Sequence, residues 1–271
     1  MTQYGYIVDS HCHLNYKGLV EEQGAVIERA RGAGVGCMLA INTKLSEYQE
    51  IVDIVESHDD VFGTVGIHPH EAENEPDVAL EALLSRAEHS KIVGIGETGL
   101  DYFYDNAPRD MQKVNFRAHI TAARETGLPV IVHTRDADQD CVSIIEEEME
   151  KGAFTGVIHC FTASQFLADS VLKMGFYISI SGIATFKNAK ELQETVKTIP
   201  ENRLLVETDA PFLAPVPHRG KTCEPAFVMD TARFVANLRG VEFDVLQQTT
   251  TENFYRLFNK VAPISNVGAR T

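Results

Sequence analysis

The segment IVDSHCHL, residues 7–14, joins a short apolar run to two histidines, and this pattern decides the predicted fold. The apolar run at residues 6–9 is the first of eight; the others lie at residues 36–42, 61–67, 91–97, 129–134, 156–160, 176–181 and 203–209. Most of them are rich in Val and Ile and apolar on both faces, which is typical of buried parallel strands. The sequence therefore predicts eight such strands.

Amphipathic segments separate or follow these runs, at residues 24–34, 78–89, 189–199, 225–238 and 243–260. In the last segment an apolar stripe with helical spacing is expected to face the core; its members are Phe243, Leu246, Thr250, Phe254 and Leu257. Eight strands alternating with helices predict a (β/α)8 TIM barrel with extra C-terminal helices. We expect one domain over residues 1–271, with its core at about 6–260. A doubly wound open sheet is the alternative, but no glycine-rich dinucleotide turn follows the first run.

Composition limits the possible functions. The net charge of −15, from 24 basic and 39 acidic residues, argues against a broad basic face that grips nucleic acid. A nuclease is not excluded, because bound divalent cations supply positive charge locally. Five scattered cysteines, no secretory signal and no apolar stretch of about 18 residues favour a cytoplasmic protein without a membrane segment.

Polar residues cluster at the ends of the predicted strands. In order along the chain they are His11, His13, His68, His70, Glu97, His133, His159 and Asp209. Barrel closure brings the carboxyl ends of the strands to one rim, where active sites of such barrels lie. A buried group of imidazoles and carboxylates without a cation would be costly, and a divalent metal removes that cost.

The ligand types narrow the metal site. Imidazole and carboxylate without thiolate suit Mg²⁺, Mn²⁺, Zn²⁺ or iron. Six candidate ligands are too many for one tetrahedral ion, so we expect two divalent ions bridged by Glu97, the carboxylate among the middle strands. Strand alternation turns Cys12 and Cys160 away from this site, and we expect them to pack.

Motifs along the chain resemble the TatD family of metal-dependent deoxyribonucleases. They are DSHCHL (9–14), GIHPH (66–70), GETGLDY (96–102), PVIVHTRDA (129–137), HCF (159–161), LLVETDAPFLAP (204–215), HRGK (218–221) and EP (224–225). The resemblance runs from Ile7 to about Lys260. It implies a (β/α)8 barrel that acts as a 3′–5′ exonuclease or endonuclease on DNA with Mg²⁺. In one departure, Thr222-Cys223 stands where the family more often has asparagine before Glu-Pro, which affects the expected substrate preference.

The resemblance also assigns the ligands to two ions. His11, His13, Glu97 and Asp209 match the ligands of one metal, and Glu97, His133 and His159 match those of the second.

The expected mechanism is attack of an activated water on phosphorus. Asp209 takes the proton of that water, and His68, with His70 as a weaker candidate, donates to a phosphate oxygen. Glu207 shares the inward face of Asp209 and is expected to orient a metal ligand.

Substrate contacts are expected on two loops. Arg219 and Lys221 are candidates for phosphate contact, although an ordinary solvated loop explains them equally well. Tyr102, Phe103 and Tyr104 are candidates for stacking on unpaired bases, or for packing in a lid.

The expected partner is DNA, single-stranded or at 3′ ends, and no obligate protein partner is evident. A different ester or amide hydrolase on the same barrel, such as an aminoacyl-tRNA deacylase, is the first rival, and the acidic charge favours it. No lysine at the strand ends suits the amidohydrolases that carry a carbamylated lysine. The second rival is a binding protein without activity, which the intact set of candidate ligands opposes.

Overall fold

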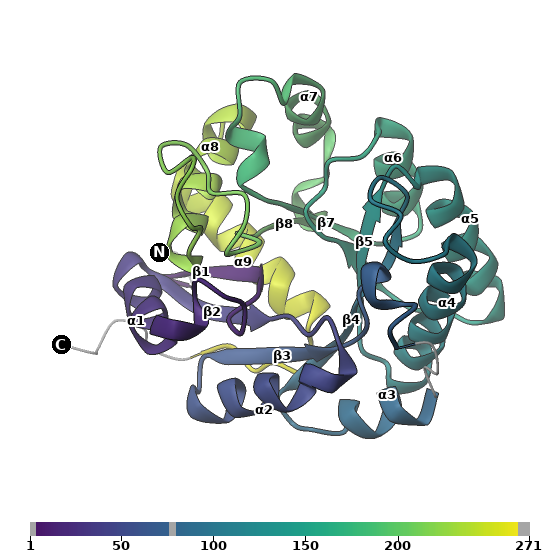
Figure 1. Ribbon diagram of the computed structural model, residues 1–271. Helices are drawn as coiled ribbons and strands as arrows, with labels where there is room; N and C mark the ends of the chain where they lie inside the picture. Colours follow the sequence, from purple (N-terminus) through teal and green to yellow (C-terminus); the bar gives the residue numbers. More distant parts are fainter. Residues whose placement is uncertain (1–3, 76–79, 265–271) are drawn as a thin grey trace.

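The computed structural model describes residues 4–75 and 80–264, and its eight parallel strands follow one another in chain order around a (β/α)8 TIM barrel (Figure 1). The strands are β1 (Ile7–Cys12), β2 (Val35–Ala40), β3 (Val61–Val65), β4 (Ile92–Asp101), β5 (Val130–Arg135), β6 (Gly156–Ile158), β7 (Tyr177–Ile180) and β8 (Leu204–Val206). The prediction of eight buried strands is thereby confirmed.

The barrel closes between β1 and β8. A parallel bridge joins Cys12 to Ala210, and the buried Asp9 carboxylate accepts hydrogen bonds from the Thr208 backbone N–H at 2.9 Å and the Thr208 hydroxyl at 2.5 Å. These contacts join residues 199 positions apart in the sequence. His11 precedes Cys12 and Asp209 precedes Ala210, so closure of the barrel fixes the positions of His11 and Asp209 relative to each other.

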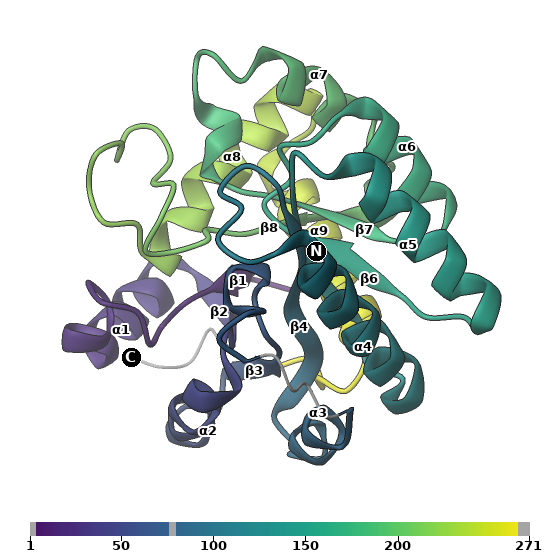
Figure 2. The ribbon, with the colours of Figure 1, turned by 45° about the vertical axis from the view of Figure 1, so that its right-hand side comes forward.

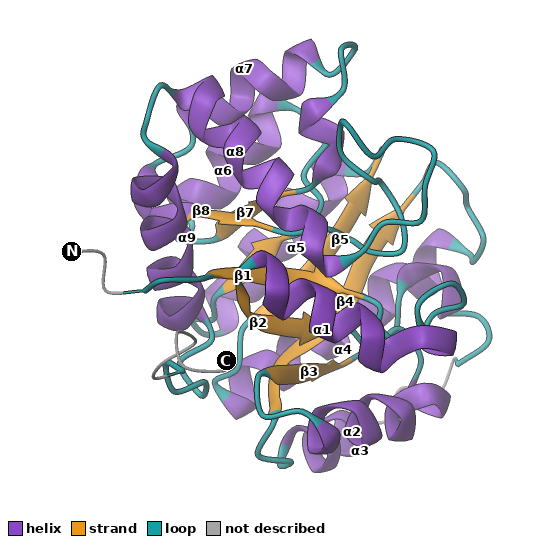
Figure 3. Cartoon of the chain, turned by 90° about the vertical axis from the view of Figure 1, so that its left-hand side faces the viewer, coloured by secondary structure: helices purple, strands orange, loops and turns teal. Residues whose placement is uncertain are grey.

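Helices surround the strands (Figure 3). They are α1 (Gln23–Ala33), α2 (Tyr48–Ser57), α3 (Leu80–Ala87), α4 (Arg109–Thr126), α5 (Asp138–Lys151), α6 (Gln165–Lys173), α7 (Lys190–Thr198), α8 (Val228–Arg239) and α9 (Phe243–Leu257). The predicted helix over 78–89 corresponds to α3, and its first two positions lie outside the described residues. None of the helices in the described ranges combines the length and the apolar character that crossing a bilayer requires.

Two apolar layers hold the fold. One lies between the strands and the outer helices, and the other fills the barrel around Val93, Ile131 and Leu205. Helix α9 contributes Phe254 and Leu257 to this inner layer, as its apolar stripe predicts. The polar side chains at the carboxyl ends of the strands therefore stand on a rigid, apolar base.

Strand β4 is longer than the sequence indicates. We expected it to end at Glu97, but its pairing with β5 continues through Gly99, opposite His133, to Asp101, opposite Arg135. At Gly99 a side chain is impossible, because a Cβ atom would lie 2.0 Å from the His133 carbonyl oxygen. The extension places a second carboxylate, that of Asp101, on this strand.

Candidate metal centre

Glu97 lies at the middle of a group of histidines and is only 2 % exposed. Its Oε1 lies 2.7 Å from Nε2 of His159 and 3.1 Å from Nδ1 of His133. Its Oε2 lies 3.4 Å from Nε2 of His11 and 3.8 Å from Nε2 of His13. The two oxygens of one carboxylate thus face two different pairs of imidazoles.

Asp209 completes the group around His11 and His13. Its Oδ1 lies 3.3 Å from Nε2 of His13 and 3.6 Å from Nε2 of His11. The residue has a left-handed backbone (φ 60°), a conformation that aspartate tolerates better than most residues, and its N–H donates to the His11 carbonyl. The structure therefore brings the other five predicted ligands together around Glu97.

The hydrogen bonds of His133 test whether a cation fits. Hydrogen bonds from His133 and His70 outweigh burial and hold the pKa of Asp101 well below its usual range, so this carboxylate only accepts. Nε2–H of His133 therefore donates to Asp101 Oδ2, at 3.1 Å. Nδ1 then lies 3.1 Å from Glu97 Oε1, and at that distance either a proton on Nδ1 or a cation shared by the two atoms must lie between them. Burial would lower the pKa of His133, but hydrogen bonds to Asp101 and Glu97 raise it, so the position favours a positive charge, which a divalent cation also supplies.

The charges of the centre point the same way. Burial alone would lower the pKa of His159, but the charge of Glu97 and hydrogen bonds to Glu207 and Glu97 raise it well above its usual value. Burial likewise opposes the ionisation of Glu97, yet the surrounding histidines hold its pKa well below the ordinary range. The site thus favours positive charge around the buried Glu97 carboxylate. The same negative charge favours a bound divalent cation.

His68 has the opposite character. Its Nδ1 accepts the backbone N–H of His70, so Nε2 carries the proton, 3.3 Å from Glu97 Oε1. Burial lowers the pKa of His68 to about 4, although the Glu97 charge opposes this effect. At neutral pH the ring is an uncharged donor at the edge of the centre.

Glu207 lies beside His159. Its Oε1 accepts the Cys160 backbone N–H at 2.7 Å and lies 3.4 Å from Nδ1 of His159. Because Glu207 is fully buried, it fixes the imidazole with Nε2 toward Glu97.

Asp101 is the residue that the sequence analysis missed. Its Oδ2 accepts from His133 and from His70 (2.9 Å), and its Oδ1 accepts the backbone N–H groups of Phe103 and Tyr104. The signal for it was present in the spacing, since Glu97 and Asp101 lie an even number of residues apart and so share a face.

The remaining predicted residues lie farther out. Arg219 and Lys221 are exposed on the loop after β8, which stands out from the rim (Figure 2). Among the described residues, no contact joins them to the histidines around Glu97. The Arg219 guanidinium instead covers the Phe186 ring at 4.1 Å. Phe103 and Tyr104 are exposed, whereas Tyr102 is half-buried.

The cysteines next to the histidines contact groups on neighbouring strands and loops. Cys12 is buried and its Sγ donates to the Leu39 carbonyl, while Sγ of Cys160 lies 3.2 Å from the Ser181 hydroxyl. Cys223, at the departure from the family pattern, is buried too, and its N–H donates to the Pro211 carbonyl.

Comparison with known proteins identifies the same family as the sequence motifs. A family model described as TatD related DNase matches residues 8–259. A protein of Escherichia coli K12 named uncharacterized metal-dependent hydrolase YcfH is 44 % identical over 257 residues, which cover 94 % of this chain and 96 % of that protein. A protein of Erwinia tasmaniensis named 3′–5′ ssDNA/RNA exonuclease TatD is 35 % identical over 257 residues, covering 93 % of this chain and 99 % of that protein.

A solved structure shares the fold closely. The crystal structure of YjjV, a TatD homologue from Escherichia coli K12, superposes with a TM-score of 0.87 at 27 % identity, covering 93 % of this chain and 98 % of that one.

Proposed function

The chain belongs to the TatD-related DNase family of metal-dependent hydrolases, and from this premise we propose that it is a nuclease that cleaves phosphodiester bonds in single-stranded DNA. The observation that carries the proposal is the position of Glu97, whose two oxygens face two separate pairs of histidines. Such an arrangement suits a pair of cations that share one bridging carboxylate. The name of the Erwinia relative supports a nucleic-acid substrate.

Two groups of side chains would hold the ions. His11, His13, Glu97 and Asp209 form one group, and Glu97, His133 and His159 form the other. When bound, Mg²⁺, Mn²⁺ or Zn²⁺ lowers the pKa of an adjacent water and neutralises charge on the phosphate oxygens.

Asp209 is suited to take the proton of the attacking water. Burial would raise the pKa of its carboxyl, but His13 and His11 outweigh that effect and lower it, so the group is ionised at neutral pH. Its described contacts use Oδ1, and the side chain is 13 % exposed, against 2 % for Glu97. Oδ2 has no contact among the described residues and is available to accept a proton.

His68 is suited to stabilise the phosphate. Its Nε2–H is an uncharged donor beside Glu97, and a donor already in place strengthens as negative charge develops on a phosphate oxygen. Glu207 contributes by holding the ring of His159 in position.

The test uses 5′-labelled single-stranded DNA with Mg²⁺ or Mn²⁺, with EDTA as the control. The protein should shorten the strand only with the metal, and the direction of the ladder reports polarity. Asp209→Asn keeps the shape of the side chain but accepts a proton poorly, so this variant should not cleave. Absence of cleavage by protein that holds metal would refute the nuclease and favour hydrolysis of another ester, including an aminoacyl ester.

A further inference from the structure

We propose that Phe103 and Arg135 form a subsite for one unpaired nucleotide of the substrate, with its base in the pocket that these two side chains border and its phosphate on Arg135. The proposal rests on the nuclease function above and adds the group that the enzyme recognises next to the bond it cleaves.

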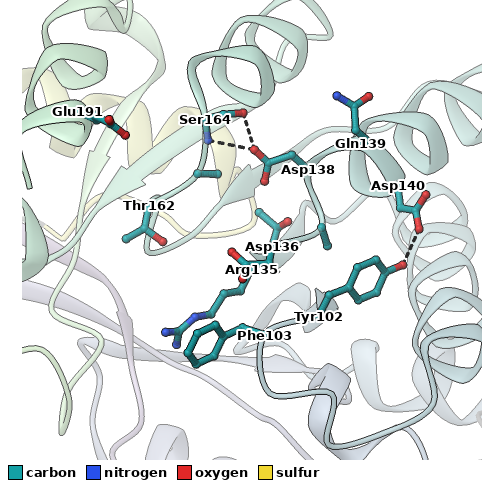
Figure 4. A pocket seen from close by; sticks show the side chains of 13 residues that line it. Tyr102, Phe103, Arg135, Asp136, Asp138, Gln139, Asp140, Thr162, Ser164 and Glu191 are labelled. Carbon is teal, nitrogen blue, oxygen red and sulfur yellow. Dashed lines mark hydrogen bonds between the residues drawn. The ribbon is translucent and has the colours of Figure 1, made fainter.

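The pocket lies over the loops that follow β4, β5 and β6 (Figure 4). It has a volume of about 810 Å³, within the usual range for small-molecule sites, and its lining includes Phe103, Arg135, Asp138 and Thr162. In Figure 4 the Arg135 side chain extends alongside the Phe103 ring at one border of this space. The cavity is large enough for a nucleobase with its sugar.

The aromatic rings at this border are unusually exposed. Phe103 is 54 % exposed and Tyr104 53 %, and the two rings meet edge to face at 4.8 Å. Exposed rings beside a nuclease centre are suitable stacking partners, since every base presents a π face. Tyr104 also contacts His70, at 5.4 Å between ring centroids, so the pair of rings extends from the histidines to the pocket.

Arg135 is a cation without a carboxylate partner in the described part of the chain. Its guanidinium lies 4.0 Å from the Phe103 ring centroid and 4.8 Å from that of Tyr104. Two other arginines near this side are paired, Arg109 with Asp105 and Arg117 with Glu148. The free N–H groups of Arg135 are therefore available to a phosphate.

Acidic side chains inside the pocket determine where the base and the phosphate of a nucleotide would bind. Asp138 accepts from the Ser164 hydroxyl and N–H, and Asp140 accepts from the Tyr102 hydroxyl and pairs with Lys113 at 2.7 Å. Asp138 has no ion-pair partner among the described residues, so its carboxylate repels a phosphate from the interior and can accept an N–H group of a base. The phosphate is thus directed to Arg135 at the border and the base to the interior.

Asp101 sets the distance between this subsite and the metal centre. One of its oxygens holds the backbone of Phe103 and Tyr104, and the other holds His133. Arg135 lies two residues beyond His133 on β5, opposite Asp101. A nucleotide bound to Phe103 and Arg135 is therefore held at a fixed position relative to the metal centre.

The test is a double-mutant cycle in which one change is made in the protein and the other in the substrate. A series of single-stranded oligonucleotides carries one abasic residue, moved stepwise from the cleaved bond, and each is cleaved by wild type, Phe103→Ala and Phe103→Trp. On intact DNA Phe103→Ala should lower kcat/KM roughly 10-fold or more, and Phe103→Trp should restore most of the loss. At one abasic position the combined fall in kcat/KM should be smaller than the product of the separate falls caused by base removal and by Phe103→Ala. The two changes are then not independent, because both remove the same contact.

Arg135→Gln is tested in the same way against a methylphosphonate, which removes the charge of one phosphate. The two losses should again fail to multiply at one position. Phe166→Ala, which removes a 44 % exposed ring from α6, is the matched control and should cleave all oligonucleotides like wild type.

Losses that multiply at every position would overturn the subsite while leaving the nuclease intact. Failure of the wild-type enzyme to cleave any oligonucleotide would instead overturn the nuclease proposal, and the subsite with it.

Discussion

Asp101→Asn should weaken metal binding although Asp101 is not a proposed ligand. In the native protein its Oδ2 accepts from Nε2–H of His133, which leaves Nδ1 free to bind a cation. The asparagine amide has two orientations. If its NH₂ group faces Nε2, the tautomer with the proton on Nδ1 is favoured. If its oxygen faces Nε2, the hydrogen bond forms without the negative charge of the Asp101 carboxylate. Both outcomes make His133 a poorer ligand.

The magnitude follows from the role of such partners. Removing a carboxylate that orients a ligating histidine typically costs 10- to 100-fold in metal affinity, or about 1.4–2.7 kcal/mol. The loss should fall on the ion held by Glu97, His133 and His159, and leave the ion held by Asp209 in place. The same substitution weakens the hold on Phe103 and Tyr104, so kcat/KM on DNA should fall as well.

The assay is competition for Mn²⁺ or Zn²⁺ with a fluorescent chelator, with thermal unfolding of the metal-free protein measured alongside. Asp105→Asn is the matched control, because Asp105 lies on the same loop, is exposed and pairs with Arg109. ¹⁵N spectra of the histidine rings report the tautomer directly. Wild-type affinity for both ions in a folded Asp101→Asn protein would refute the reasoning, as would a proton on Nδ1 of His133 in the native enzyme.

Four further predictions address separate parts of the molecule. Asp209→Ala should lower turnover by at least about 100-fold while the circular dichroism spectrum stays native; full activity would exclude this residue as the base. Glu97→Ala should reduce the bound metal measured by mass spectrometry, and an unchanged stoichiometry would exclude a bridging carboxylate. Arg219→Ala should raise KM for an oligonucleotide more than for a small phosphodiester, whereas equal effects would remove it as a phosphate contact. Burial lowers the pKa of His119 to about 4, against about 6.5 in the unfolded chain, so the native ring stays neutral while the unfolded ring takes up a proton. Stability should therefore fall by about 3 kcal/mol as the pH drops from 6.5 to 4, and urea unfolding of His119→Gln should lack this contribution; equal pH dependence in both proteins would contradict it.

The sequence was sufficient for the strands and for the residues at their ends. Parallel strands buried on both faces are continuous apolar runs, so polar residues that follow such a run are expected toward the carboxyl end of the strand. His133 and His159 could therefore be placed on one rim from their positions alone. The helical period of Phe254 and Leu257 likewise placed α9 against the core.

Features that depend on pairing between distant segments could not be predicted. Strand β4 continues past Glu97, where the predicted strand ended, because β5 lies beside it. The stacking of Arg135 on Phe103 depends on the same pairing of β4 with β5, because Arg135 lies on β5 and Phe103 on the loop after β4. The proton position on His68 follows from the local backbone at His70, which the sequence does not specify.

A protein with a net charge of −15 can hold a polyanion only where its own charges are compensated. Several of its arginines are already paired with carboxylates, among them Arg29 with Glu224 and Arg31 with Asp60, and so do not form a basic track across the surface. Under the proposals above, positive charge is concentrated at the ions around Glu97 and at Arg135. Such a site contacts few phosphates, so its affinity should depend weakly on salt and strongly on the unpaired base. Recognition of this kind suits the free end of a strand better than the interior of a duplex, where the base is not available to Phe103.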